Sequence, residues 1–275
     1  MFTDGKSAPV PLRDASTVVL VRDSDRGIEI FLQRRVKQMA FAGGMTVFPG
    51  GGVDARDRDA EIAWVGPEVG WWAERFGADV ETARALVCAA VRETFEECGV
   101  LLAGASADIV HPNPAELTGE RERLVNKDLS FAQFLNDNDL VLRTDLLAPL
   151  SHWITPKNEV RRYDTRFFLA ELPAGQTADG ETSEASETLW LTADAALDAW
   201  NSGNHFLLPP TWSQLRAIAE YATVADLMAA DHEITPIEPS IADQSGLGGL
   251  RFADSDAYLA SLGDGRMEQL KNTNS

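Results

Sequence analysis

The sequence has few cysteines and few histidines. It contains 2 Cys and 4 His in 275 residues. Cys88 and Cys98 fall on one expected helix, roughly 15 Å apart along its axis, which is too far for a disulfide. Neither cysteine has a partner at metal-ligand spacing. We therefore expect neither a disulfide nor a structural zinc site.

Positive charge is also scarce. The chain has 24 Lys and Arg against 43 Asp and Glu, a formal net charge of -19. Such a chain repels polyanions, so we expect no nucleic acid polymer as a partner. A small phosphate ester can still bind where metal ions and a few local cations neutralise it.

Long apolar runs are missing. No run reaches membrane-spanning length, and the N-terminal stretch MFTDGKSAPVPLRD lacks the apolar core of a signal peptide. We therefore expect no membrane partner and a cytoplasmic chain. A hydrophobic fraction of 44% suits one large domain with a sizeable core. We predict a single domain over residues 1–240 and a partly ordered tail over 241–275, where Gly, Ser, Asp and Asn predominate.

The chain is organised around the stretch AAVRETFEECGV, from Ala89 to Val100. Its glutamates Glu93, Glu96 and Glu97 are spaced i, i+3, i+4 and fall on one helical face, where like charges repel. A solvated acidic face is one interpretation. The other is a hard divalent cation, which prefers oxygen ligands and relieves the repulsion.

Two neighbours and an upstream loop favour the cation. Arg92 can pair with Glu96 at i, i+4, and Gly99 stands where a helix C-cap belongs. The glycine-rich stretch VFPGGG lies upstream, at Val47 to Gly52. Successive glycines allow backbone groups to approach a phosphate or a metal-bound water closely.

The run from Arg92 to Val100 resembles the second half of the Nudix box, R-E-U-x-E-E-x-G-U with U aliphatic. Only Thr94 departs from this pattern, because it stands where the pattern has an aliphatic residue. The first half departs more, because its Gly and Glu positions hold Ala78 and Arg84. An FPGG followed by an insertion and then A-x-R-E-T-x-E-E-x-G is similar to the Nudix branch of the peroxisomal coenzyme A diphosphatases and their bacterial relatives.

The resemblance implies an α/β Nudix fold, an α/β/α sandwich around a mixed β-sheet, with a helical insertion over 55–80 and C-terminal helices over 193–232. In the C-terminal region, Thr211 suits the N-cap of a helix from Trp212 to Met228. The aromatic side chains of the insertion favour a small local core, with a substrate lid or a homodimer contact as alternatives. They are Trp64, Trp71, Trp72 and Phe76.

The resemblance also implies a hydrolase that uses Mg²⁺ or Mn²⁺ as cofactor. The implied metal ligands are Glu93, Glu96, Glu97 and the backbone carbonyl of Gly51. Arg92 is expected to orient the glutamates.

Further residues are implied as substrate contacts or as a base. Phosphate contacts are expected from Arg34, Arg35, Gly50 and Gly51, although the two arginines also suit a solvated strand end. A carboxylate before a Trp-containing strand is expected as an extra metal ligand or general base, with Glu184 as first choice and Glu187 as second. The general base stays open between Glu184 and a helix glutamate.

The expected partner is a small-molecule nucleotide, a nucleoside diphosphate linked to another moiety. Coenzyme A or acyl-coenzyme A is the leading candidate, although the fuller coenzyme A signature has an Arg where this chain has Ala40. ADP-ribose, NADH and dinucleoside polyphosphates are the alternatives. A nucleoside triphosphate pyrophosphatase and a non-catalytic ligand sensor on the same fold also remain open.

Overall fold

A mixed β-sheet forms the centre of the fold. The computed structural model describes residues 10–36, 42–58, 62–157, 159–241 and 249–262. The strands of the sheet are β1 (Leu12–Ser24), β2 (Gly27–Arg35), β3 (Thr46–Val47), β4 (Gly50–Gly52), β8 (Leu147–Ile154), β9 (Arg162–Glu171), β10 (Ala185–Thr192) and β11 (Pro236–Ile237). Their order is β10-β2-β1-β9-β8-β11, with β3 paired to β2 and β4 to β1. The β1–β9 and β8–β11 pairs are parallel, and the other pairs are antiparallel.

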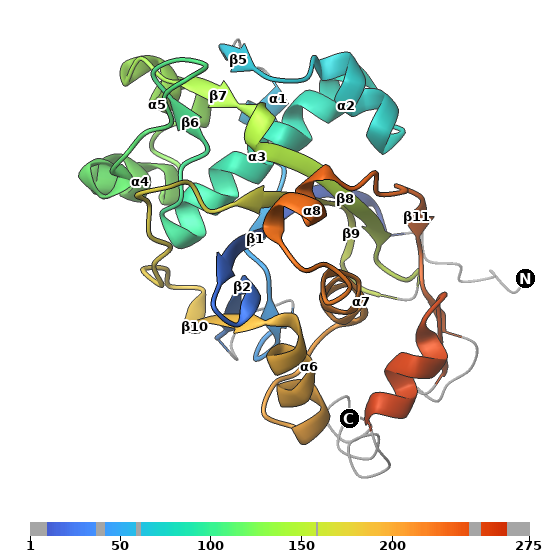
Figure 1. Ribbon diagram of the computed structural model, residues 1–275. Coiled ribbons are helices and arrows are strands. Elements are labelled where there is room, and N and C mark those ends of the chain that lie inside the picture. The colour runs from blue at the N-terminus through green and yellow to red at the C-terminus, as the bar shows by residue number, and fades with distance from the viewer. Residues whose placement is uncertain (1–9, 37–41, 59–61, 158, 242–248, 263–275) are drawn as a thin grey trace, which may run out of the picture.

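Helices cover both faces of this sheet (Figure 1). One layer contains α1 (Ala55–Arg58), α2 (Val69–Phe76), α3 (Val80–Cys98), α4 (Thr118–Val125) and α5 (Phe131–Asp137). The other contains α6 (Ala193–Ser202), α7 (Pro209–Ile218) and α8 (Val224–Ala229). Short elements complete the chain: β5 (Trp64–Val65), β6 (Ala103–Gly104), β7 (Val141–Arg143), β12 (Ser240–Ile241), β13 (Leu250–Arg251) and two 3-10 turns, Pro114–Leu117 and Thr144–Leu146. The predicted α/β/α sandwich around a mixed sheet is confirmed.

The strand β1 shows why the sheet is buried on both faces. Side chains alternate along a strand, so Val18 and Leu20 enter one core while Val19 and Val21 enter the other. A strand covered on both faces reads as a continuous apolar run, as STVVLVR does. The turn to β2 uses Gly27 at φ 104°, a conformation that suits glycine.

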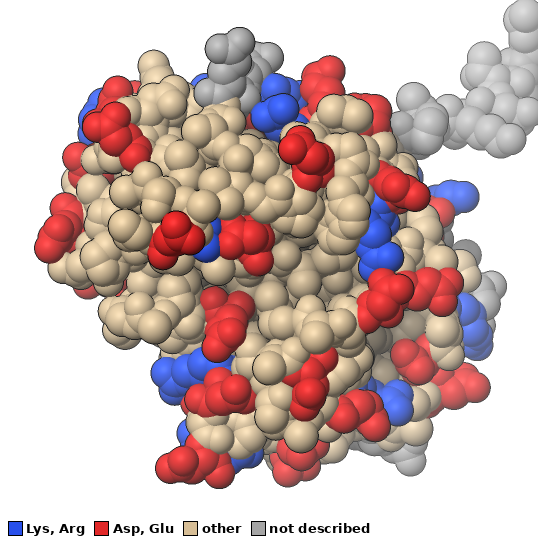
Figure 2. All heavy atoms as spheres, turned by 45° about the horizontal axis from the view of Figure 1, so that its top comes forward, with Lys and Arg blue, Asp and Glu red and all other residues tan. Residues whose placement is uncertain are grey.

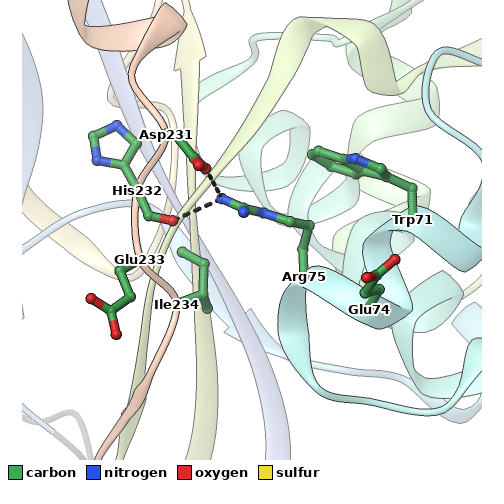
Figure 3. Close-up of a pocket in the computed structure, with 7 residues that line it drawn as sticks. All are labelled: Trp71, Glu74, Arg75, Asp231, His232, Glu233 and Ile234. Carbon is green, nitrogen blue, oxygen red and sulfur yellow. Dashed lines mark hydrogen bonds and ion pairs between the residues drawn. The ribbon is translucent and has the colours of Figure 1, made fainter.

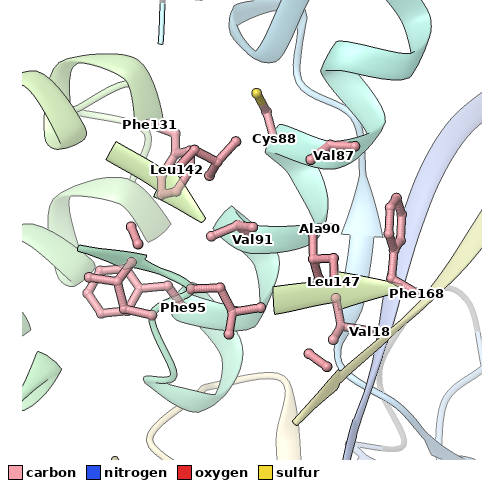
Figure 4. Close-up of a cluster of buried hydrophobic side chains, with 14 of the residues drawn as sticks. Val18, Val87, Cys88, Ala90, Val91, Phe95, Phe131, Leu142, Leu147 and Phe168 are labelled. Carbon is pink, nitrogen blue, oxygen red and sulfur yellow. The ribbon is translucent and has the colours of Figure 1, made fainter. Parts of the chain in front are cut away.

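The helix α3 begins and ends where local chemistry predicts. The Asp79 carboxylate accepts the Thr82 N–H at 2.8 Å as an N-cap, and Gly99 ends the helix with φ 71°. Side chains of its apolar face, among them Val91 and Phe95, are fully buried in the first core, where Leu142, Leu147 and Phe168 also lie (Figure 4).

The insertion belongs to this first core. Trp72 is fully buried and stacks on Phe76 with ring centroids 5.7 Å apart, and both rings contact Phe168 of β9. The expectation of a small local core is therefore wrong, because these rings reach the central sheet. Trp71, the residue before Trp72, keeps 41% of its surface exposed.

The C-terminal region differs from its predicted helix. Residues 212–228 do not form one helix, because Thr223 accepts the Asp226 N–H at 3.1 Å and caps a new helix, α8. Thr211 is not an N-cap either. Leu208 holds that position, and prolines occupy the first turn of α7, where their missing N–H has no helical partner to lose.

Packing continues beyond residue 240. Leu250, Tyr258 and Leu262 are buried in the second core, and the Tyr258 hydroxyl donates to the Leu207 carbonyl at 2.9 Å. The rest of the expected tail, residues 242–248 and 263–275, lies outside the described residues. Within the described part of the chain, no helix combines the length and apolarity needed to cross a membrane.

Candidate active site

The acidic face of α3 is buried against the glycine strand β4. The side chains of Glu93 and Glu96 are 13% and 15% exposed, and Glu97 is 6% exposed. The Gly50 N–H donates to Glu97 Oε2 at 2.9 Å. A Cβ added at Gly51 would lie 2.6 Å from the Glu93 carboxylate, so a larger residue there would displace the Glu93 side chain. The solvated-face interpretation is wrong, because the loop covers the carboxylates.

Arg92 compensates part of this negative charge. Its Nη1 lies 2.7 Å from Glu93 Oε1 and 3.3 Å from Glu96 Oε2, so the predicted pair with Glu96 is present. Its Nη2 donates to the Gly52 carbonyl at 3.0 Å. Among the described residues, Glu97 forms no ion pair. Arg92 therefore connects Glu93 and Glu96 to the glycine strand and forms no ion pair with Glu97.

Burial and mutual repulsion shift the glutamates toward their protonated forms. Burial, with a contribution from the Glu96 charge, raises the pKa of Glu93 to about 7 against the opposing effect of Arg92. Burial and the Glu93 charge raise the pKa of Glu97 well above its ordinary value. Burial also raises the pKa of Glu96. Buried carboxylates in such proximity ionise readily only beside a compensating cation.

These residues fit a divalent cation in chemistry and charge. Carboxylate and carbonyl oxygens are the ligands that Mg²⁺ prefers, and the glutamates carry more negative charge than Arg92 offsets. As they stand, no three His, Cys, Asp or Glu side chains within the described residues meet the geometry of a metal site. Binding would therefore require the carboxylates to change their side-chain conformations.

Arg35 and Glu184 lie beside Glu97. Arg35 Nη2 is 2.8 Å from Glu184 Oε2, because β2 and β10 pair at Arg35 and Ala185. The Glu184 charge raises the pKa of Glu97, and the Arg35 charge lowers it. The structure thus brings an arginine and a fourth carboxylate to the helix glutamates.

Arg34 and Glu187 do not join this group. Neighbouring residues of a strand point to opposite faces, and Arg34 shares its face with Leu32 of the second core. Its guanidinium pairs with Glu187 at 3.4 Å and donates to the Asn204 carbonyl. The expectation that Arg34 contacts substrate phosphates is therefore corrected: its side chain lies on the far face of the sheet from α3.

Two residues of the site had no role in the sequence prediction. Asp57, from the insertion, binds Arg92 through both carboxylate oxygens. Arg121 of α4 donates to the Glu96 carbonyl at 3.1 Å and binds both oxygens of Asp179, in the loop that leads to β10. Neither the Asp57–Arg92 contact nor the Arg121–Asp179 contact can be predicted from local sequence spacing, because each joins segments that are distant in the sequence.

A cavity of about 510 Å³ lies elsewhere, between α2 and the segment after α8 (Figure 3). Arg75 spans it and binds the Asp231 carboxylate at 2.8 Å and the His232 carbonyl at 2.7 Å. Its wall contains Trp71 and further carboxylates, and none of the α3 glutamates lines it. The cavity is therefore separate from the candidate active site.

The α/β/α sandwich and the glutamate helix facing a glycine strand define a Nudix fold. A solved Nudix hydrolase structure from Alicyclobacillus acidocaldarius shares it, with a TM-score of 0.65 and 26% identity over 82% of this chain and 99% of that chain. The NUDT19 Nudix domain model matches residues 72–218, just over half of the chain. The chain belongs to this Nudix family.

Curated relatives carry a more specific name. The protein named acyl-coenzyme A diphosphatase NUDT19 of Homo sapiens is 27% identical over 239 residues, 73% of this chain and 63% of the relative. The protein of the same name from Gallus gallus is 29% identical over 239 residues, 72% of this chain and 62% of the relative. The chain thus spans less than two thirds of the length of these relatives.

Proposed function

We propose that the protein is a metal-dependent Nudix hydrolase that cleaves the diphosphate bond of a nucleoside diphosphate linked to another moiety. The observation that carries this proposal is the set of three buried glutamates on α3, held against the glycine strand and only partly compensated by Arg92. Coenzyme A or acyl-coenzyme A is the leading substrate, supported by the names of the curated relatives.

The α3 glutamates and the Gly51 carbonyl would hold Mg²⁺ or Mn²⁺. When bound, such an ion neutralises phosphate oxygens and lowers the pKa of a water ligand. Arg92 contacts both Glu93 and Glu96 through its Nη1 and so holds the two side chains close together. The N–H of Gly50 binds one oxygen of Glu97, and the other oxygen would be available to hold the ion.

Arg35 and Glu184 complete the proposed reaction. The half-exposed Glu184 carboxylate lies 2.8 Å from the Arg35 guanidinium. A diphosphate oxygen that binds Arg35 would compete with Glu184 for this contact. Release from Arg35 leaves the Glu184 carboxylate available to accept the proton of the attacking water. A helix glutamate remains the second candidate for this base.

The surface charge supports a small partner. Figure 2 shows Asp and Glu spread over one face of the molecule, with Lys and Arg between them only in places. Together with the net charge of -19, this favours a small nucleotide over a nucleic acid polymer. Whether the chain forms a homodimer stays a prediction.

Replacing Arg35 by Gln should raise KM about 10–100-fold, because one charge-assisted contact to the diphosphate is lost. Replacing its neighbour Arg34 by Gln is the matched control and should leave KM near that of the wild type. Steady-state kinetics with coenzyme A measure both variants. Equal effects of the two changes would contradict the assignment of Arg35 to the substrate.

The test of the proposed function is product analysis by mass spectrometry. Purified protein is incubated with Mg²⁺ or Mn²⁺ and coenzyme A, ADP-ribose, NADH, diadenosine polyphosphates or nucleoside triphosphates. Release of 4′-phosphopantetheine and 3′,5′-ADP is expected. AMP from another substrate would keep the chemistry and change the substrate, and pyrophosphate from a triphosphate would favour the triphosphatase alternative. Binding of a ligand without any product would favour the sensor.

A further inference from the structure

Asp57 is a buried carboxylate, and each of its two oxygens accepts a hydrogen bond. It lies in α1, within the insertion, and is 3% exposed. Its Oδ1 is 3.0 Å from Arg92 Nε and its Oδ2 is 2.9 Å from Arg92 Nη2. The Asp54 N–H also donates to Oδ2, at 2.8 Å. Two-point contacts of this kind fix the plane of a guanidinium as well as its charge.

This contact decides which part of Arg92 reaches the glutamates. Asp57 and the Gly52 carbonyl occupy Nε and Nη2, so Nη1 alone contacts Glu93 and Glu96. The contact also changes the charge of the group. Three carboxylates, those of Asp57, Glu93 and Glu96, contact one guanidinium, for a formal charge of -2 when all are ionised. Without the Asp57 charge this value is -1.

The chain obtains this carboxylate from the insertion. The positions upstream of Arg92 where the box has Gly and Glu hold Ala78 and Arg84, and Arg84 lies over the Trp64 ring, 5.6 Å from its centroid. Arg84 thus offers Arg92 no acceptor. The insertion, by contrast, packs α1 and α2 against α3.

We propose that Asp57 is a positioning residue for the candidate metal ligands: it fixes the Arg92 guanidinium and offsets its positive charge, so that Arg92 meets Glu93 and Glu96 through Nη1 alone and the site keeps a net negative charge for a divalent cation. This inference rests on the proposed function and deepens it. It gives the insertion a role at the active site that requires no contact with substrate.

The test is Mn²⁺ binding by isothermal titration calorimetry with the full chain, alongside thermal unfolding. Asp57→Asn should weaken Mn²⁺ binding about 10–100-fold, the range seen when partners of metal ligands are removed. Asp54→Asn is the matched control. Asp54 lies in the same segment and pairs with Arg56 at 3.0 Å, without contacting Arg92. It should keep the wild-type Mn²⁺ affinity even if its melting temperature falls.

The outcomes separate this inference from the proposed function. Wild-type Mn²⁺ affinity in Asp57→Asn, or an equal loss in both variants, overturns the positioning role alone. Wild-type protein that binds no Mn²⁺ overturns the proposed function and this inference with it. If Asp57→Asn does not fold, Asp57→Glu replaces it, since the longer side chain keeps the charge but moves the guanidinium. Unchanged affinity in that folded variant overturns the proposal.

Discussion

Glu97→Gln is expected to reduce turnover by about 10²–10³-fold while the fold is kept. The amide has the shape of the carboxylate and still accepts the Gly50 N–H, but it carries no charge for a divalent cation. Glu97 is buried and its pKa is raised by burial and by the Glu93 charge. Removing its charge therefore relieves repulsion in the metal-free protein, whose melting temperature should be at or above that of the wild type.

Thermal unfolding with and without Mn²⁺ provides a readout independent of turnover. At 100 times its dissociation constant, a ligand of the folded state adds about 2.7 kcal/mol, or about 5–10 °C in a chain of this size. Wild-type protein should show this increase and Glu97→Gln should lose most of it. Glu122→Gln, at an exposed position of α4, is the control and should behave as the wild type. Full turnover by Glu97→Gln would remove the assigned metal site.

The parts of the site that local spacing governs could be predicted from the sequence. The i, i+4 pair of Arg92 with Glu96 and the αL cap at Gly99 follow from helix geometry alone. The difference between Arg34 and Arg35 was also accessible. Alternation along the strand IEIFLQRR places Arg35 with Gln33 and Arg34 with Leu32, on opposite faces.

Other features depend on contacts that no local pattern encodes. Asp57 meets Arg92, 35 residues further on, only after the insertion folds back onto α3, and Arg121 meets Asp179 across 58 residues. The break between α7 and α8 reflects a competition, since the capping bond of Thr223 replaces helical continuation through residues 219–223. Apolar periodicity alone favours one long helix there.

Trp72→Ala is expected to lower the free energy of unfolding by about 3–5 kcal/mol. The side chain is fully buried between Phe76 and Phe168, so truncation leaves a cavity that three elements cannot easily close. At about 2–4 °C per kcal/mol, the melting temperature should fall by about 10 °C. Chemical denaturation monitored by circular dichroism measures the loss.

Two control variants test whether the loss of stability in Trp72→Ala comes from the buried ring. Trp71→Ala removes the adjacent ring, which is 41% exposed, and should cost far less. Trp72→Phe keeps much of the packing, and it breaks no bond to a described residue, because Trp72 Nε1 has no hydrogen-bond partner among them. If the insertion were a lid over the substrate, Trp72→Ala would change KM with little loss of stability. A large loss of stability in Trp72→Ala alone would instead indicate that the insertion is part of the core. Packing of the insertion against α3 then keeps Asp57 within reach of Arg92.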